Sequence, residues 1–309
     1  ATAANPVSSV DGAPARQGLW LAVVVITGLN LRPFLTAIGP LTNDISAATG
    51  LDLRGMAWLT LLPMLLMGLG AWFGPALQQR LGARRVLLGA LAVLALGSAL
   101  RTWAPGGATL IATAALCGLG VAFVQAVFPG VIKRQFPGHV APVMGLYSAA
   151  LMGGGALGAQ LTPLAAQGGA WRGALAWWAL PVLAALLLAW RALPRTAPTH
   201  SNHSGPSATR WLLQRPRTWL LMLSFGLVNG GYASVVAWLA PFYQSHGWSA
   251  AQSGSLVALL SLAQAGMALL LPLLVARQRD RRPWLWLTLA LQAAGFAALA
   301  LWPDVAPRT

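Results

Sequence analysis

The chain has 309 residues, of which 57% are hydrophobic and only 8% are charged, and its mean hydropathy is +0.66. Soluble domains carry about 25% charged residues, so this composition excludes an ordinary soluble domain and indicates an all-α polytopic membrane protein. A formal net charge of +15 would favour a nucleic-acid partner in a soluble chain. These arginines lie in short loops between apolar runs, where they signal membrane topology, and we expect no nucleic-acid partner.

Residues 1–17 are polar and lack the charged start, apolar core and cleavage site of a secretory signal peptide, so they are expected to form a disordered lead-in. At roughly 20 apolar residues per membrane-spanning helix, the rest of the chain contains nine candidate spans. They cover approximately residues 18–41, 55–79, 85–103, 107–132, 140–164, 171–193, 217–241, 250–276 and 283–303. No segment of the sequence shows the period of two that a barrel strand requires.

The first span contains a charged residue inside its apolar run. Residues 30–40 read Asn-Leu-Arg-Pro-Phe-Leu-Thr-Ala-Ile-Gly-Pro, which places Arg32 between two apolar stretches. A charge at the bilayer centre costs roughly 3 kcal/mol on insertion scales, so Arg32 is predicted to face a protein interior or a watered cavity. Binding of an anionic or strongly polar solute is the favoured role. The alternative is an arginine that snorkels to the interface or holds a structural ion pair.

Helical spacing sorts the polar neighbours of Arg32. Arg32 and Thr36 fall on one stripe with Gly28 and Gly39, so both are candidate solute ligands. The guanidinium suits a small linear or planar anion because its fork can donate two parallel hydrogen bonds and it keeps its charge. Asn30 points roughly 200° away from Arg32 at the helical period, and we expect it to support the site by bonding a neighbouring helix.

Five further polar residues lie within other spans. Gln125 in the fourth span is predicted to bond either the solute or another helix, and the sequence favours neither. Tyr147 in the fifth span shares a face with glycines that allow close helix packing, and its ring and hydroxyl are a candidate solute contact. Asn229 and Tyr232 in the seventh span are candidate ligands, and Gln264 in the eighth is a candidate supporting group.

Other chemistries find little support in the sequence. His200 and His203 lie in a polar connection without carboxylate or thiol partners, so no metal site is predicted. All five acidic residues lie in terminal or loop segments, whereas a proton-coupled carrier normally has a titratable relay inside the membrane. This pattern favours uniport, coupling through the charge of the solute, or a relay in helices missing from the sequence, and a proton or another coupling ion stays open as a partner. With no inward base or nucleophile pair, neither an enzyme nor a cofactor is expected.

The loop charges predict the orientation of the chain. With the N-terminus in the cytoplasm, 15 Lys and Arg residues lie on the cytoplasmic side and 4, Arg101 among them, on the other. This bias follows the positive-inside rule, so we expect a multi-pass protein of a bacterial cytoplasmic (inner) membrane. The polar connection after the sixth span divides it into a six-helix bundle at 18–193, a cytoplasmic central loop at 194–216 and a partial bundle of three helices at 217–309.

A weak internal repeat relates the two parts. Pro272 follows Pro75 by 197 residues, and Arg281 follows Arg84 by the same interval. The same offset makes Asn229 the counterpart of Arg32. Parallel repeats of six spans, with the solute site between the halves near the midplane, are typical of one large class of secondary transporters.

Several motifs spread over the first half belong together. They are residues 30–33 (Asn-Leu-Arg-Pro), Gly39-Pro40, Pro63, Arg101, residues 128–137 (Phe-Pro-Gly-Val-Ile-Lys-Arg-Gln-Phe-Pro), residues 145–148 (Gly-Leu-Tyr-Ser) and Trp171-Arg172. On these motifs the sequence resembles the major facilitator superfamily, and within it the cyanate and 2-nitroimidazole transporter (CynX/NimT) branch. The resemblance covers nearly the whole first half and is looser from Trp211 onward.

The resemblance implies a secondary active or facilitated transporter of a small anionic or polar solute, cyanate-like or nitroimidazole-like, that works by alternating access. Two alternatives stay open: a polyspecific drug or metabolite efflux carrier of the same fold, and a transport-incompetent truncated fragment. One signature differs, because no acidic residue follows Gly74 in the loop after the second span. Since the family has twelve spans, the sequence is expected to be a fragment or a truncated product that is three helices short.

Overall fold

The computed structural model describes residues 14–194, 214–275, 278, 280 and 282–301. The predicted lead-in up to residue 13, most of the central loop with His200 and His203, and the chain after residue 301 lie outside these ranges. Within them the secondary structure is helical throughout, and nine helical segments are long and apolar enough to cross a membrane. The all-α polytopic fold and the predicted number of spans are therefore confirmed.

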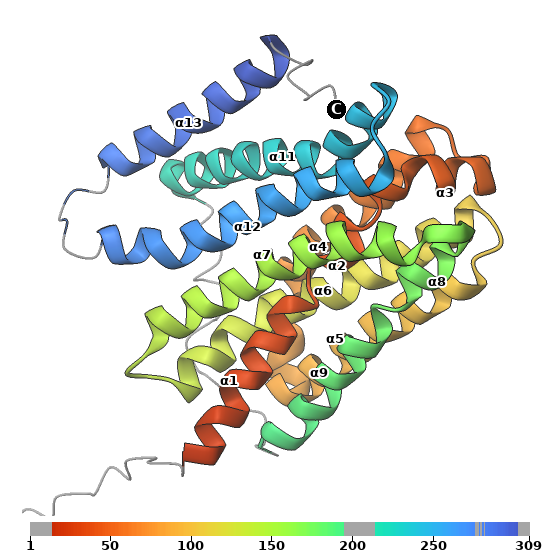
Figure 1. Ribbon diagram of the computed structural model, residues 1–309. Coiled ribbons are helices and arrows are strands. Elements are labelled where there is room, and N and C mark those ends of the chain that lie inside the picture. Colours follow the sequence, from red (N-terminus) through yellow and green to blue (C-terminus); the bar gives the residue numbers. More distant parts are fainter. Residues whose placement is uncertain (1–13, 195–213, 276–277, 279, 281, 302–309) are drawn as a thin grey trace, which may run out of the picture.

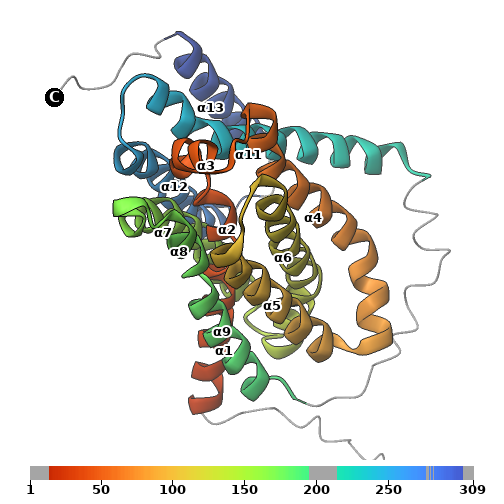
Figure 2. The same ribbon diagram turned by 90° about the vertical axis from the view of Figure 1, so that its right-hand side faces the viewer.

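Figures 1 and 2 show the helices from two directions at right angles. In chain order they are α1 (Pro14–Leu29), α2 (Pro33–Thr36), η1 (Gly39–Leu41), α3 (Thr42–Thr49), α4 (Leu53–Leu81), α5 (Ala83–Leu100), η2 (Arg101–Trp103), α6 (Gly107–Gln135), α7 (Val140–Ala165), η3 (Gln167–Gly169), α8 (Trp171–Ala176), α9 (Ala179–Ala192), α11 (Pro216–Ser245), α12 (Ala250–Val275) and α13 (Arg282–Leu301). The connection between α3 and α4 is tight because Gly50 adopts a φ of 70° and the Asp52 carboxylate caps α4 through the Gly55 amide at 2.8 Å.

The core of the first six spans lies where α1, α5, α6, α7 and α9 meet. Leu31, Leu91, Val121 and Phe128 are each 0% exposed there. Small residues bring the helices together, as is typical of membrane bundles. At Gly118 on α6, for example, a Cβ would lie 2.5 Å from the Cα of Pro63 on α4. The bundle is therefore packed too closely for larger side chains at such positions.

The first span is interrupted in its middle. The sequence predicts one helix over 18–41, but the structure divides this span into α1, α2, η1 and α3, and it continues to Thr49. Pro33 and Pro40 cause the interruption because proline lacks the N–H that would continue the helical hydrogen bonds. Figure 2 shows the short α2 near the centre of the helices. The interruption leaves backbone groups and the Arg32 side chain in the interior.

The helices after residue 214 pack onto the first bundle mainly through α12. α7 and α12 run antiparallel, because Gly155 lies opposite Ser261 while Gly254 lies against the Ala159 carbonyl. α11 reaches the interrupted span, where a Cβ on Gly39 would lie 3.2 Å from the Val236 carbonyl oxygen. α13 lies beside α11 at the outer edge of the molecule (Figure 1), where a Cβ on Gly231 would lie 2.9 Å from Gln292 Nε2. The second part of the chain thus meets the first at the interruption and along α7.

Candidate functional site

Arg32 and four other side chains form what we name the Arg32 cluster. Each of the five has a buried side-chain nitrogen or oxygen without a hydrogen-bond partner in the described part of the chain. These atoms are Arg32 Nε, Tyr147 Oη, Tyr232 Oη, Ser261 Oγ and Gln264 Oε1. Buried polar atoms in proteins are normally hydrogen-bonded. Tyr232, Tyr147 and Ser261 lie near Arg32, and Gln264 follows Ser261 by about one helical turn. These groups mark a place that can accept a polar solute.

Arg32 is half-buried at the break between α1 and α2. Its guanidinium carbon lies 4.9 Å from the centre of the Tyr232 ring on α11. A cation over an aromatic face is worth about 0.5–2 kcal/mol. This contact holds the guanidinium in place and leaves Nε without a partner. Arg32 therefore presents a fixed positive charge with hydrogen-bonding capacity to spare.

Tyr147 approaches the same charge from α7. Its side chain is only 5% exposed, and its ring packs against Phe128 with the ring centres 5.5 Å apart. Arg32 is near enough to act electrostatically on the Tyr147 hydroxyl. A phenol hydroxyl can donate or accept a hydrogen bond, so this buried group can bind either pole of a solute.

Ser261 on α12 belongs to the site although its sequence neighbourhood did not point to it. A Cβ built on Gly155 would lie 3.3 Å from Ser261 Oγ, 3.4 Å from Arg32 Cβ and 3.4 Å from Thr36 Cγ2. Gly155 therefore marks the point where α2, α7 and α12 meet, and Ser261 is 0% exposed there. The available signal was its spacing: Ser261 precedes Gln264 by three residues, which places both on one face of α12.

Thr36 and Asn30 are bonded to the backbone of other helices. The Thr36 hydroxyl donates to the Gly155 carbonyl at 2.8 Å and is 0% exposed. The Asn30 amide donates to the carbonyl of Ile26 at 2.7 Å and, across to α9, to that of Pro181 at 3.1 Å. Both side chains hold the interrupted span in place. Thr36 lies beside the cluster, but its donor is already in use.

Gln125 and Asn229 do not join the Arg32 cluster. Gln125 is half-buried on α6, three residues before Phe128, whose ring packs against that of Tyr147. Asn229 is exposed on α11, where its amide donates to the Phe225 carbonyl of its own helix at 2.9 Å. Tyr232 is the member of α11 that reaches Arg32.

Arg101, which the loop charges predict to lie on the periplasmic side, is buried between helices. Its side chain is 1% exposed, and its Nη2 donates to the Phe34 carbonyl of α2 at 3.2 Å. Arg101 lies near the end of the predicted span 85–103, directly after the last residue of α5. The side chain instead points into the first bundle, so Arg32 is accompanied by a second interior arginine.

The charges of the described residues suit an anion. Asp44, Asp52 and Asp280, the acidic residues within the described ranges, are all exposed, so no carboxylate neutralises Arg32 from within the bundle. The same ranges contain no group of three or more His, Cys, Asp or Glu that could hold a metal ion. The cluster can bind and orient a small molecule through one cation, three hydroxyls and one amide.

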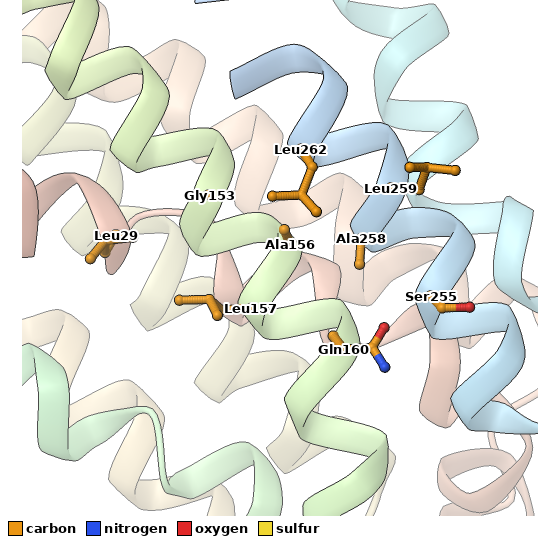
Figure 3. A pocket seen from close by; sticks show the side chains of 9 residues that line it. All are labelled: Leu29, Gly153, Ala156, Leu157, Gln160, Ser255, Ala258, Leu259 and Leu262. Carbon is orange, nitrogen blue, oxygen red and sulfur yellow. The ribbon is translucent and has the colours of Figure 1, made fainter. Parts of the chain in front are cut away.

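A separate groove lies between α7 and α12, on the other side of α7 from Tyr147. It has a volume of about 530 Å³ and is lined by Leu29, Gly153, Ala156, Leu157, Gln160, Ser255, Ala258, Leu259 and Leu262. Figure 3 shows these residues, of which only Gln160 and Ser255 carry polar side-chain atoms. The groove contains no charged side chain, so its chemistry does not suit an anion.

Comparison with known sequences bears on the function of this site. The sequence matches the Major Facilitator Superfamily over residues 21–307. It is 44% identical over 288 residues to the cyanate transport protein CynX of Escherichia coli strain K12, covering 93% of this chain and 74% of that protein. It is 34% identical over 287 residues to the 2-nitroimidazole transporter of the same strain, covering 92% and 72% respectively.

Solved structures give the same fold. The D-xylose–proton symporter aligns with a TM-score of 0.64 over 87% of this chain and 71% of its own, at 16% identity. The xylose transporter XylE of E. coli in its inward-open conformation aligns with a TM-score of 0.55 over 85% and 70%, at 15% identity. At such low identity these likenesses show the fold alone. Together with the family match and the curated relatives, they show that this chain is a multi-pass membrane transporter, not an enzyme, and that it belongs to the major facilitator superfamily in the branch of the cyanate and 2-nitroimidazole transporters.

Proposed function

We propose that the protein is a secondary transporter of a small anionic solute such as cyanate and that Arg32 is its anion ligand. The observation that carries this proposal is the buried Arg32 Nε, which has no hydrogen-bond partner in the described part of the chain and lies beside Tyr232 and Ser261, whose hydroxyls also lack one. The printed names of two relatives, a cyanate transport protein and a 2-nitroimidazole transporter, support this solute class. A buried charge is costly unless something pairs with it, and a transported anion would supply that partner.

The solute would bind between the two parts of the chain. Arg32 and Tyr147 come from the first bundle, whereas Tyr232, Ser261 and Gln264 come from α11 and α12. A linear anion can accept hydrogen bonds from the guanidinium at one end and from a hydroxyl at the other. Because these donors belong to different parts, binding would change the preferred arrangement of the two, as alternating access requires.

A polar, uncharged solute such as a nitroimidazole would use the same groups differently. Its ring would stack on Tyr147 or Tyr232, and its nitro oxygens would accept from Arg32. The half-buried Arg32, with its unpaired Nε, favours a small anionic or polar solute over the hydrophobic substrates of a polyspecific efflux carrier. Uptake into proteoliposomes tests the proposal: cyanate, nitrate, acetate and 2-nitroimidazole are supplied with and without a proton gradient. Failure of all four to accumulate or to bind would refute it.

Ser261→Ala should lower the affinity for the anion by about tenfold, because the loss of one hydrogen bond to a charged partner costs about 1.5 kcal/mol. The readout is the dissociation constant of the purified protein for cyanate. Ser255→Ala is the matched control, since Ser255 lies on the same helix but lines the apolar groove. Equal changes in the dissociation constant for the two substitutions would show that Ser261 does not bind the anion.

We also propose that the N-terminus lies in the cytoplasm of a bacterium, as the loop charges predict. Cysteines placed at Gln79 and Gln278, both exposed, should then react with a membrane-impermeant maleimide only after the cells are opened. The background variant is Cys117→Ala, which removes a buried thiol. Labelling of either position in intact cells would reverse or break the proposed topology.

A further inference from the structure

Arg101 is the largest side chain among those that the structure buries completely. It follows the end of α5, and its Nη2 donates to the carbonyl oxygen of Phe34 at 3.2 Å. Phe34 lies in α2, only two residues after Arg32. Arg101 thus touches the backbone of the segment that presents Arg32, although it belongs to η2 and not to the Arg32 cluster.

The Phe34 carbonyl is free to accept this bond because the helix is interrupted. In a continuous helix it would accept from the Ile38 amide. In the structure the Ile38 amide bonds the Leu35 carbonyl at 3.3 Å instead. Arg101 therefore replaces the missing backbone donor. A buried carbonyl without any donor would cost free energy comparable to a lost hydrogen bond, so Arg101 directly stabilises the interrupted geometry.

The segment is held from a second direction by Thr36, whose hydroxyl donates to the Gly155 carbonyl of α7 at 2.8 Å. Hydrogen bonds to η2 and α7 therefore fix the four-residue α2. Arg32 precedes this helix directly and is its N-cap residue, with no side-chain cap of its own. The direction in which the Arg32 side chain leaves the backbone thus depends on the hydrogen bonds that Arg101 and Thr36 make.

Burying the Arg101 guanidinium costs more free energy than one hydrogen bond to a carbonyl returns. Its Nε and Nη1 are also buried and have no partner in the described part of the chain. Several kcal/mol are typical for a buried charge that is incompletely paired, and an apolar side chain would fill the space at less cost. A stability role alone therefore explains its presence poorly, whereas a role in the geometry of the neighbouring site explains both its charge and its place.

We propose that Arg101 is a positioning residue for the anion site: by holding the Phe34 carbonyl it fixes the break in the first span and thereby the direction of Arg32. This inference rests on the proposed function, in which Arg32 binds the solute. Arg101 itself does not touch the solute. Its loss should therefore act through Arg32 and should be visible in the backbone of residues 31–38 even without solute.

The test combines two measurements on Arg101→Gln, Arg101→Lys and the control Arg172→Gln. Arg172 is a matched control because it lies on α8 and its Nε also donates to a backbone carbonyl, that of Ala104 at 2.9 Å, which is not a carbonyl of the interrupted segment. Amide hydrogen exchange of residues 31–38 reports the geometry of the break. The dissociation constant for cyanate reports how well Arg32 binds the anion. Both are measured on purified protein, and affinity is expressed per folded molecule.

We expect Arg101→Gln to accelerate amide exchange in residues 31–38 and to weaken cyanate binding about tenfold. Arg101→Lys keeps a cationic donor and should cause less than half of that effect. In an Arg32→Lys background, Arg101→Gln should weaken binding by less than about twofold, because positions that act through one another are not additive. Arg172→Gln should change neither readout. If Arg101→Gln does not fold, the same double-mutant comparison is made with Arg101→Lys in place of Arg101→Gln, again with and without Arg32→Lys.

Unchanged cyanate affinity in Arg101→Gln would overturn the inference, whether or not amide exchange changes, because Arg101 would then be structural only. An effect fully additive with Arg32→Lys would overturn it too, since Arg101 would act independently. If the wild-type protein binds no cyanate, the proposed function fails and amide exchange decides about Arg101: faster exchange confined to residues 31–38 supports its hold on the break, and unchanged exchange refutes it.

Discussion

Replacing Arg32 with glutamine should abolish detectable uptake of the anion while the protein still inserts and folds. Arg32 supplies the charge in the cluster, and the loss of two hydrogen bonds to a charged partner, each worth about 1.5–3 kcal/mol, lowers affinity by roughly 100-fold or more. Folding should survive because the substitution removes a charge whose Nε lacks a partner. Uptake in proteoliposomes and the thermal midpoint of the purified protein measure the two effects.

Arg32→Lys separates charge from geometry. It keeps the cation but loses the planar fork and the close stacking on Tyr232, so we expect affinity to fall roughly tenfold. Arg54→Gln is the control, since Arg54 is an exposed arginine near the start of α4. A protein in which Arg32→Gln keeps its affinity and loses stability instead would have a structural arginine at this position, and the anion-site proposal would be wrong.

The spans themselves were predictable because the bilayer imposes a simple physical requirement. A helix must present roughly 20 apolar residues to cross it, and runs of this length stand out in a chain with 8% charged residues. The boundaries follow from the same length, as with Val140–Ala165 for the predicted 140–164. What apolar length does not encode is a break inside a span. Pro33 and Pro40 interrupt the first span, which the sequence predicts as one helix over 18–41 and the structure divides into four pieces.

The site was partly predictable for a similar reason. Arg32 stands out because a charge in an apolar run is rare, and Tyr147 and Tyr232 stand out as polar aromatics within spans. Ser261 does not, since a serine hydroxyl costs little in a helix and is common at helix contacts. Its importance depends on the antiparallel packing of α7 and α12, which brings it to Gly155. That pairing is tertiary and has no local signal.

Arg101 and Asn229 show how position along a span misleads. Arg101 stands at a span end, where arginines usually reach water, but its long side chain turns back to the Phe34 carbonyl that the break exposes. Asn229 lies at the repeat offset from Arg32, but its place on α11 faces outward and its amide bonds its own helix. In each case the direction of the side chain, which packing determines, decides the role.

The glycines of α7 carry the second large effect that we expect. A Cβ on Gly154 would overlap the Leu29 carbonyl oxygen and lie 2.6 Å from its carbonyl carbon, at the end of α1. A Cβ on Gly158 would lie 2.6 Å from Thr36 Oγ1 and 2.7 Å from Pro33 Cα. These are mostly backbone atoms, which cannot move aside as a flexible side chain does. Only glycine allows α7 to approach the interrupted span this closely.

Gly154→Ala and Gly158→Ala should therefore each cost roughly 3 kcal/mol of folding stability through overpacking, which corresponds to a fall on the order of 10 °C in the thermal midpoint. Transport should fall as well, because a displaced α7 carries Tyr147 away from Arg32. Gly153→Ala is the matched control within the same glycine triplet. Its Cβ would lie 3.8 Å from Leu29 Cδ2, an ordinary contact, so its midpoint and uptake should stay near those of the wild type. A Gly154→Ala protein as stable and as active as Gly153→Ala would show that α7 does not pack on the Leu29 carbonyl, and the geometry proposed for the Arg32 cluster would fall with that contact.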